Sequence, residues 1–283
     1  MAEKGKSTYY RSRELLVGAI SYIVLIILSI FFFYPIFWMV DLSIMPKAEV
    51  FRLPPRYLVW PSLSSYIKVV TMWEFTKYLM NSVITSSTSV ILSLLLGVPC
   101  AYVISRYDFP GRQNSAFFIL SFRFLPPVAV AIPFYILYTS VGLFDTITGL
   151  VLFYIVSNLP YVVWLMKGFF DAVPVEVEEA AEVDGYSKLE VFYKVTLPLV
   201  YKGLAATTMF CLLLTWNEFA AALILTGTNA RTLPVQALQF VASLGLDWGA
   251  LAAASMIISL PMMIFGIIIR NHLIRGLTFG AVR

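Results

Sequence analysis

The chain has 283 residues, of which 60% are hydrophobic and 13% are charged, and its mean hydropathy is +0.84. About a quarter of the residues in a typical soluble domain are charged, so this composition argues against a water-soluble protein. The formal net charge is +4, and the sequence shows no basic patch of the kind that nucleic-acid binding requires. One histidine and two cysteines leave little material for histidine-based catalysis or a metal site.

Six apolar stretches approach or exceed the roughly 20 residues that a helix needs to cross a bilayer. They are continuously apolar, which favours helices over the alternating strands of a barrel. We therefore predict an all-α polytopic membrane protein with six transmembrane helices, forming a single domain over residues 1–283. The predicted spans are Leu15–Val40, Tyr78–Ile104, Ser115–Tyr138, Ile147–Met166, Leu204–Thr226 and Ala250–Ile269.

Basic residues set the predicted orientation of the spans. The first span is too long for a signal peptide and has no small-residue cleavage pattern, so we interpret it as a retained anchor. With the N-terminus inside, the cytoplasmic segments hold 13 Lys and Arg, whereas the outer loops hold 6. This bias predicts that both termini and residues 167–203 face the cytoplasm. The outer loop Asp41–Trp73 contains four prolines and is predicted to be an ordered, non-helical cap.

One face of the second span carries small residues. Ser82, Ser86, Ser89, Ser93 and Gly97 follow one another at spacings of three or four, so they share a face of the helix. Small residues let transmembrane helices approach each other closely, and we favour this packing role over the lining of a pore.

Polar side chains inside the third and fifth spans indicate a path for a polar solute, because an ionisable residue in the membrane usually faces protein or water. Arg123 is predicted to line an internal cavity or to pair with another subunit. An ion pair with Glu218 and a satisfied charge between helices remain open as alternatives. Trp216, Asn217 and Glu218 suit a hydroxyl-rich ligand, although at most two of them share a helix face. Pro126 and two neighbouring prolines are predicted to bend the third span.

The cytoplasmic segment 167–203 contains a charged passage with strong helix signals. Pro174 precedes a predicted short helix over Val175–Asp184, which has acidic residues near its start. Gly185 follows it as a residue that tolerates the left-handed conformation. Ser187-Lys188-Leu189-Glu190 then has the spacing of a capping box, which predicts a second short helix. Pro198 is expected to interrupt that helix.

This passage is predicted to dock a partner protein. Leu189, Phe192 and Tyr193 form one apolar stripe, and Ala180 and Ala181 are small enough for close approach to another surface. An amphipathic helix resting on lipid headgroups is the alternative, but the seven acidic residues of the region oppose binding to anionic lipid. A docking role is therefore favoured.

The same passage resembles a known signature. Glu179-Ala180-Ala181, three residues, Gly185, nine residues, then Val195-Thr196-Leu197-Pro198 is similar to the EAA motif of permease subunits in binding-protein-dependent ABC importers. Four further pieces resemble the carbohydrate branch of that family, the maltose-type second permease, and the similarity spans nearly the whole chain. These pieces are Ala101–Arg106 with Phe109–Arg112, Gly142–Thr146, Trp216–Phe219 and Gly276–Arg283.

The resemblance implies a coupling helix that sits in a cleft of a cytoplasmic ATPase subunit. Glu179 would make polar contacts with the ATPase, Ala180 and Ala181 would permit close packing, and Gly185 would supply the bend. The other expected coupling residues are Leu189, Phe192, Leu197 and Pro198. The cytoplasmic tail at about 270–283, above all residues 276–283, is expected to make a second contact.

The resemblance also implies a function. The chain would be a permease that imports a sugar or related polyol by alternating access, together with a second homologous permease, two ATPase subunits that bind the ATP, and an extracytoplasmic solute-binding protein. We expect the chain itself to be no enzyme and to bind neither a cofactor nor a metal. A stand-alone secondary transporter is the alternative; it predicts interrupted helices in repeated halves, and we find no convincing repeat.

Overall fold

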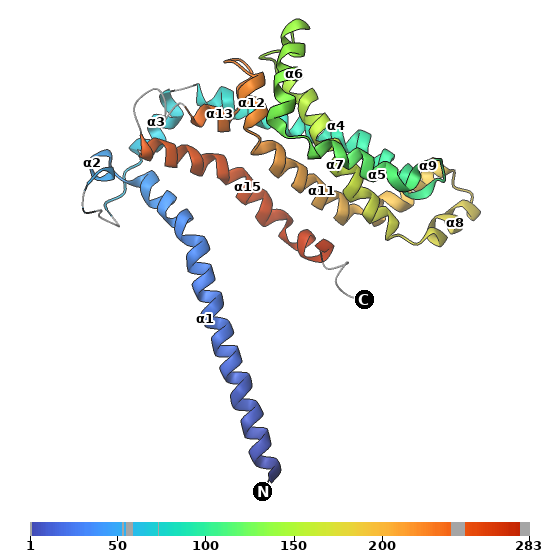
Figure 1. Cartoon of the computed structure of the whole chain (residues 1–283), viewed down its shortest axis with the longest axis horizontal. Helices are drawn as coiled ribbons and strands as arrows, with labels where there is room; N and C mark the ends of the chain where they lie inside the picture. The colour runs from blue at the N-terminus through green and yellow to red at the C-terminus, as the bar shows by residue number, and fades with distance from the viewer. Residues whose placement is uncertain (1, 53, 55–58, 73, 239–246, 278–283) are drawn as a thin grey trace.

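A computed structural model describes residues 2–52, 54, 59–72, 74–238 and 247–277. These residues form helices joined by short connections (Figure 1), which confirms the predicted all-α class. Four helices are long and apolar enough to cross a membrane, and up to six spans result if each of two bent helix pairs counts as one. The four long helices are α1 (Ala2–Ile44), α4 (Phe75–Arg106), α7 (Ile147–Asp171) and α15 (Trp248–Leu277).

The third predicted span is broken instead of straight. It consists of α5 (Arg112–Ser121), the 3-10 turn η1 (Phe122–Phe124) and α6 (Pro127–Ser140), with a bend of 85° between its two halves. Leu125 takes an extended conformation at the break. A residue that precedes proline is driven away from the helical conformation, and Pro126 follows Leu125. The predicted bend is confirmed, and at 85° the two halves of the span are nearly perpendicular.

The fifth predicted span, Leu204–Thr226, is also not continuous. Helix α11 (Tyr201–Trp216) ends at Trp216, and the short helix α12 (Ala220–Leu225) follows after three residues. The helix is therefore interrupted at 217–219, where neither proline nor glycine is present.

Helices α4 and α7 pack along each other (Figure 1). The four serines of the small-residue face are almost fully buried. A Cβ atom at Gly97 would lie 2.6 Å from Val162 Cγ1 of α7, so only glycine permits this approach. The Ser86, Ser89 and Ser93 hydroxyls donate to backbone carbonyls of α4 itself. The packing interpretation of this face is confirmed.

Helix α1 leaves the rest of the molecule along most of its length (Figure 1). It contacts α15 and α3 (Ser64–Met72), while apolar side chains from Val17 to Val40 stay exposed. Such a surface needs lipid or another protein chain.

The outer loop Asp41–Trp73 is not free of helix, contrary to the prediction. Its described part contains the end of α1, the turn α2 (Lys47–Val50) and α3. Pro46 directly precedes α2 and Pro61 lies in the non-helical segment before α3, so these two prolines mark breaks between helices. At the other end of the chain, α15 continues to Leu277. The expected second contact at 276–283 lies mostly outside the described residues.

Candidate functional site

The predicted docking passage forms one compact element at an end of the molecule (Figure 1). We define the docking element as residues 174–200. It contains α8 (Val175–Val183), a turn, and a continuous helix made of α9 (Lys188–Glu190), the π-helical turn η2 (Val191–Thr196) and α10 (Leu197–Leu199). The predicted helix, turn and helix are confirmed. Gly185 has φ +93°, as expected of a glycine at a helix end.

The predicted capping box starts the second helix. Ser187 Oγ accepts the Glu190 N–H, and Glu190 Oε2 accepts the Ser187 N–H at 3.0 Å. Hydrogen bonding from Lys194, followed by bonds from Ser187, lowers the pKa of Glu190 to about 2. The carboxylate therefore stays charged throughout the physiological pH range.

Pro198 does not interrupt the second helix, which corrects the prediction. The Leu197 N–H bonds to the Phe192 carbonyl, five residues back, and Pro198 follows as the second residue of α10. Because the helix changes type at this point, the N–H that proline lacks falls in the first turn of a new segment. The helix ends instead near Val200, where it bends by 75° into α11.

The predicted docking residues do not all face outward. Glu179, Ala180, Gly185, Leu189 and Pro198 are exposed, and Leu197 is half-buried. By contrast, Ala181 and Phe192 are buried inside the chain. The Phe192 ring lies 4.7 Å from the ring of Tyr102 in α4. The outer surface of the element is thus narrower than the sequence pattern suggested.

The residues that hold the docking element in place were not predicted from the sequence. Glu178 is buried, and its Oε1 accepts a bond from Arg106 Nε at 2.8 Å. Its Oε2 accepts a bond from the Tyr102 hydroxyl at 2.9 Å. Arg106 Nη2 also donates to the carbonyls of Phe170 and Val173 at the end of α7. The spacing of Glu178 and Ala181, one turn apart, could have indicated this buried face.

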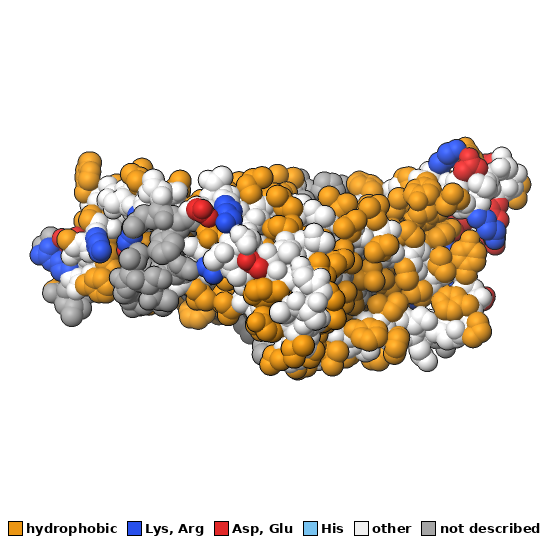
Figure 2. Space-filling view, turned by 90° about the horizontal axis from the view of Figure 1, so that it is seen from above, with side chains coloured by type: hydrophobic (Ala, Val, Ile, Leu, Met, Phe, Trp, Pro, Cys, Tyr) orange, Lys and Arg blue, Asp and Glu red, His pale blue; other side chains and the backbone are white. Residues whose placement is uncertain are grey.

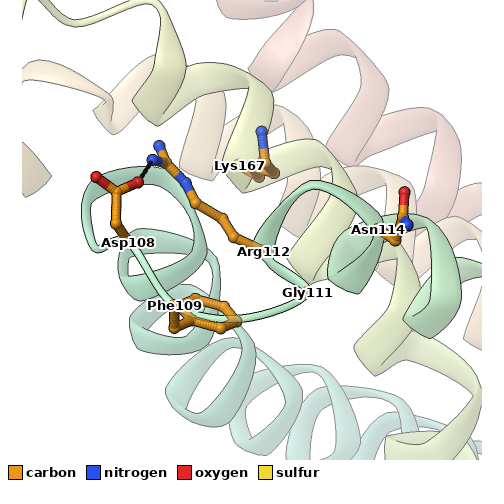
Figure 3. Close-up of a pocket in the computed structure, with 6 residues that line it drawn as sticks. All are labelled: Asp108, Phe109, Gly111, Arg112, Asn114 and Lys167. Atoms are coloured by element: carbon orange, nitrogen blue, oxygen red, sulfur yellow. Dashed lines mark hydrogen bonds and ion pairs between the residues drawn. The ribbon is translucent and has the colours of Figure 1, made fainter.

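A polar pocket of about 720 Å³ lies beside this attachment, at the turn from α4 to α5 (Figure 3). The charged side chains that line it already form ion pairs and hydrogen bonds with other groups of the chain. Arg112 pairs with Asp108 and donates to the carbonyls of Ile104 and Ser105, while Lys167 pairs with Asp171. These bonds satisfy the carbonyls at the end of α4.

Charge and apolar surface are separated along the molecule. On the face shown in Figure 2, charged side chains gather at the end that holds the docking element and again over the opposite half. A broad hydrophobic surface lies between them. This pattern is typical of a chain whose middle is surrounded by lipid.

A second candidate region is a cavity of about 560 Å³ between the broken third span and α7, with Cys100 of α4 and Glu218, which follows α11, also in its lining. Its walls are mostly apolar and aromatic, and Arg123 and Glu218 both line it. The Arg123 guanidinium lies 4.8 Å from the centre of the Tyr161 ring, and its Nε is buried without a hydrogen-bond partner. Among the described residues, no ion pair joins Arg123 to Glu218.

Glu218 explains the restart of the helix at α12. Its two carboxylate oxygens accept the Ala221 and Ala222 N–H groups, and Tyr154 donates to Oε2 at 3.2 Å. The remaining two predicted path residues point elsewhere. Trp216 is buried and donates to the Ile258 carbonyl, whereas Asn217 is exposed and donates to the Leu213 carbonyl. The structure therefore brings Arg123 and Glu218 to one cavity but leaves Trp216 and Asn217 out of its lining.

Asp145 accounts for the sequence motif at 142–146. It has φ +56°, and its carboxylate accepts the backbone N–H groups of the four residues 227–230. Burial would raise the pKa of Asp145, but these bonds outweigh burial and hold the pKa below its usual value. The carboxylate thereby fixes the loop after α12.

Comparisons with known proteins agree with these features. Residues 93–279 match the family described as binding-protein-dependent transport system inner membrane component. A probable ABC transporter permease of Sinorhizobium fredii is 34% identical over 91% of this chain and 92% of its own length. A trehalose transport system permease of Mycobacterium tuberculosis is 30% identical over 88% of this chain and 92% of its own length. A bacterial ABC transporter for import of the acidic polysaccharide alginate shares the fold, with a TM-score of 0.76, 24% identity, and coverage of 90% of this chain and 96% of the other.

Proposed function

Because this chain belongs to the inner membrane components of binding-protein-dependent transport systems, it is a multi-pass, non-catalytic permease subunit of an ABC importer, and we propose that its cargo is a sugar. The cargo class includes di- and oligosaccharides and related polyols. The similarity to a trehalose permease supports this class.

We further propose that the docking element couples transport to a separate ATPase. The observation that carries this proposal is the exposure of Glu179, Ala180 and Leu189 on an element that is otherwise anchored inside the chain. A short exposed helix with a small side chain, followed by the exposed apolar Leu189, suits insertion into a groove of a partner protein. ATP would bind to two such partner subunits, and both termini would face the cytoplasm with the docking element.

The cavity with Arg123 and Glu218 is the proposed start of a substrate path in this subunit. Its volume of about 560 Å³ lies within the range of ligand pockets. A donor on one wall and an acceptor on another suit a ligand with many hydroxyl groups, and aromatic walls suit the apolar faces of sugar rings. Trp216 and Asn217 would affect the substrate path only indirectly, by fixing the end of α11 next to Glu218.

The exposed apolar length of α1 supports assembly with a second homologous permease. The family description makes transport dependent on a binding protein, and we propose that this protein acts on the outer side of the membrane. The outer ends of the helices, including α3 and the loop fixed by Asp145, are the surface proposed to receive that protein.

Reconstitution tests the proposed function. The chain is placed in liposomes with its partner permease, ATPase subunits and binding protein, and uptake of labelled trehalose, maltose and a polyol is measured with and without ATP. We expect ATP-dependent uptake of at least one of these compounds. Uptake by the chain alone, without the ATPase, would instead indicate a stand-alone secondary transporter.

A further inference from the structure

Two adjacent glutamates of the docking element lie in opposite environments. Glu178 is 6% exposed, whereas Glu179 faces outward. Neighbouring residues on a helix point about 100° apart, so α8 presents Glu179 to a partner while it turns Glu178 toward α4. We propose that Arg106 and Glu178 are positioning residues that make α8 move as one body with α4 and α7. This inference rests on the proposed function, because it assumes an ATPase that displaces the docking element.

The ion pair ties three helices at one point. The Arg106 and Glu178 side chains are 9% and 8% exposed. Besides Glu178, Arg106 binds two carbonyls at the end of α7 and the hydroxyl of Ser105. A buried charge that loses its partner is strongly disfavoured, because it stays desolvated without compensation. Helix α8 therefore cannot slide along α4 without breaking the two buried bonds that Glu178 accepts from Arg106 and Tyr102.

The second half of the docking element is attached at the same place. Tyr102 donates to Glu178, and its ring contacts both Phe192 and Phe170, with ring centres 4.7 and 5.4 Å apart. Apolar contacts are non-directional, so on their own they permit sliding. The polar bonds to Glu178 add direction and fix the register. The ion pair of Arg106 and Glu178 thus keeps the docking element at a fixed position along α4.

Distance measurements test the one-body movement without knowledge of the cargo. Spin labels are attached in the assembled complex at Val183→Cys on α8 and Thr76→Cys near the outer end of α4, both exposed positions, with Cys100→Ala and Cys211→Ala. We expect the same distance without nucleotide and with ATP plus vanadate. Arg106→Ala is expected to broaden the distribution. A wild-type distance that changes with nucleotide, or an unchanged distribution in Arg106→Ala, overturns the proposal.

Coupling measurements test its consequence. Arg106→Ala and Glu178→Gln are expected to lower the uptake of labelled trehalose per ATP hydrolysed, because each change leaves a buried charge without its partner, while the ATPase still co-purifies. Arg112→Ala is the matched control, since Arg112 binds Asp108 and the end of α4 but not the docking element. Equal coupling in Glu178→Gln and wild type overturns the proposal.

The proposed movement of α8 with α4 can be tested even if one variant or the proposed cargo fails. If Arg106→Ala does not accumulate in the membrane, Glu178→Gln, which keeps the size of the side chain, is measured in both experiments in its place. If the wild-type complex hydrolyses ATP but takes up no sugar, the proposed cargo is wrong, and the label distances still decide whether α8 and α4 move together.

Discussion

Gly185 is the single residue at which the docking element turns. Its φ of +93° lies in a region that other residues adopt only with strain, although a Cβ there would meet no neighbouring atom. We expect Gly185→Ala to cost about 1 kcal/mol and to weaken binding of the ATPase, because the exposed ends of the two helices shift. Co-purification of the ATPase measures this effect.

Gly168→Ala is the control for that substitution. Gly168 lies inside α7, where a Cβ also meets no neighbouring atom but φ is not positive. Alanine is favoured over glycine in a helix, so this variant should bind the ATPase as wild type does. Equal loss in both variants would mean that the turn geometry is unimportant.

The stability that Asp145 gives to the loop after α12 is expected to depend on pH. Its pKa is depressed in the folded chain, so its bonds stabilise the fold above the unfolded pKa of about 3.9 and are lost as the pH falls through the lower, folded value. Asp145→Asn should reduce the melting temperature at pH 7 by roughly 2–4 °C and remove part of the fall below pH 4. Melting curves in detergent between pH 7 and pH 3 measure both effects.

The exposed Asp184→Asn at the end of α8 is the control for Asp145. It should leave the melting curves unchanged, since Asp184 lies outside the loop. If both variants melt alike at every pH, the carboxylate of Asp145 does not fix the loop.

Features that depend on neighbouring residues could be predicted from the sequence. Gly185 and the Ser187–Glu190 cap involve neighbours within three residues, so the sequence alone contains the whole interaction. Glu178 and Asp145 could not be assigned, because their partners lie 72 to 85 residues away in the chain. Nothing local distinguishes Glu178 from Glu179.

The contact between α4 and α7 depends on Gly97. A Cβ at this position would lie 2.6 Å from Val162 Cγ1 and 2.9 Å from Val162 Cβ. Since a β-branched side chain cannot rotate its Cβ away, Gly97→Ala should destabilise the protein by about 1–3 kcal/mol. Thermal unfolding in detergent measures the loss.

A second substitution identifies the cause. Val162→Ala should recover part of the stability lost in Gly97→Ala, because it removes the crowding atom. Gly266→Ala in α15, where a Cβ meets no neighbour, should have little effect. Strict additivity of the Gly97 and Val162 changes would contradict the proposed contact.

At the element scale, the four continuous long helices follow from the length of their apolar runs. The bend near Pro126 follows from the restriction that proline places on its neighbour. The break at 217–219 was not predictable in this way, because it depends on Glu218 capping α12 and on Tyr154 of α7. The position of Pro198 inside a helix depends on a π-helical turn, which has no comparable sequence signal.

Two exposed surfaces of the molecule indicate where other proteins or lipid must cover it. Helix α1 exposes an apolar length that a partner permease or lipid must cover, and the docking element exposes both charged and apolar side chains, among them Glu179, Val183 and Leu189, at one end. The composition predicted a membrane protein, and the continuous apolar runs predicted that it is all-α. It could not predict which helix leaves the bundle, because every span is apolar.

Photo-crosslinking from the docking element tests the central claim most directly. A photoreactive amino acid is placed at exposed Ala180 in the assembled importer, with exposed Thr228 on the loop after α12 as the control position. We expect Ala180 to crosslink to the ATPase subunit and Thr228 not to do so. Crosslinks from Ala180 to the periplasmic binding protein, or none to the ATPase, would contradict the account.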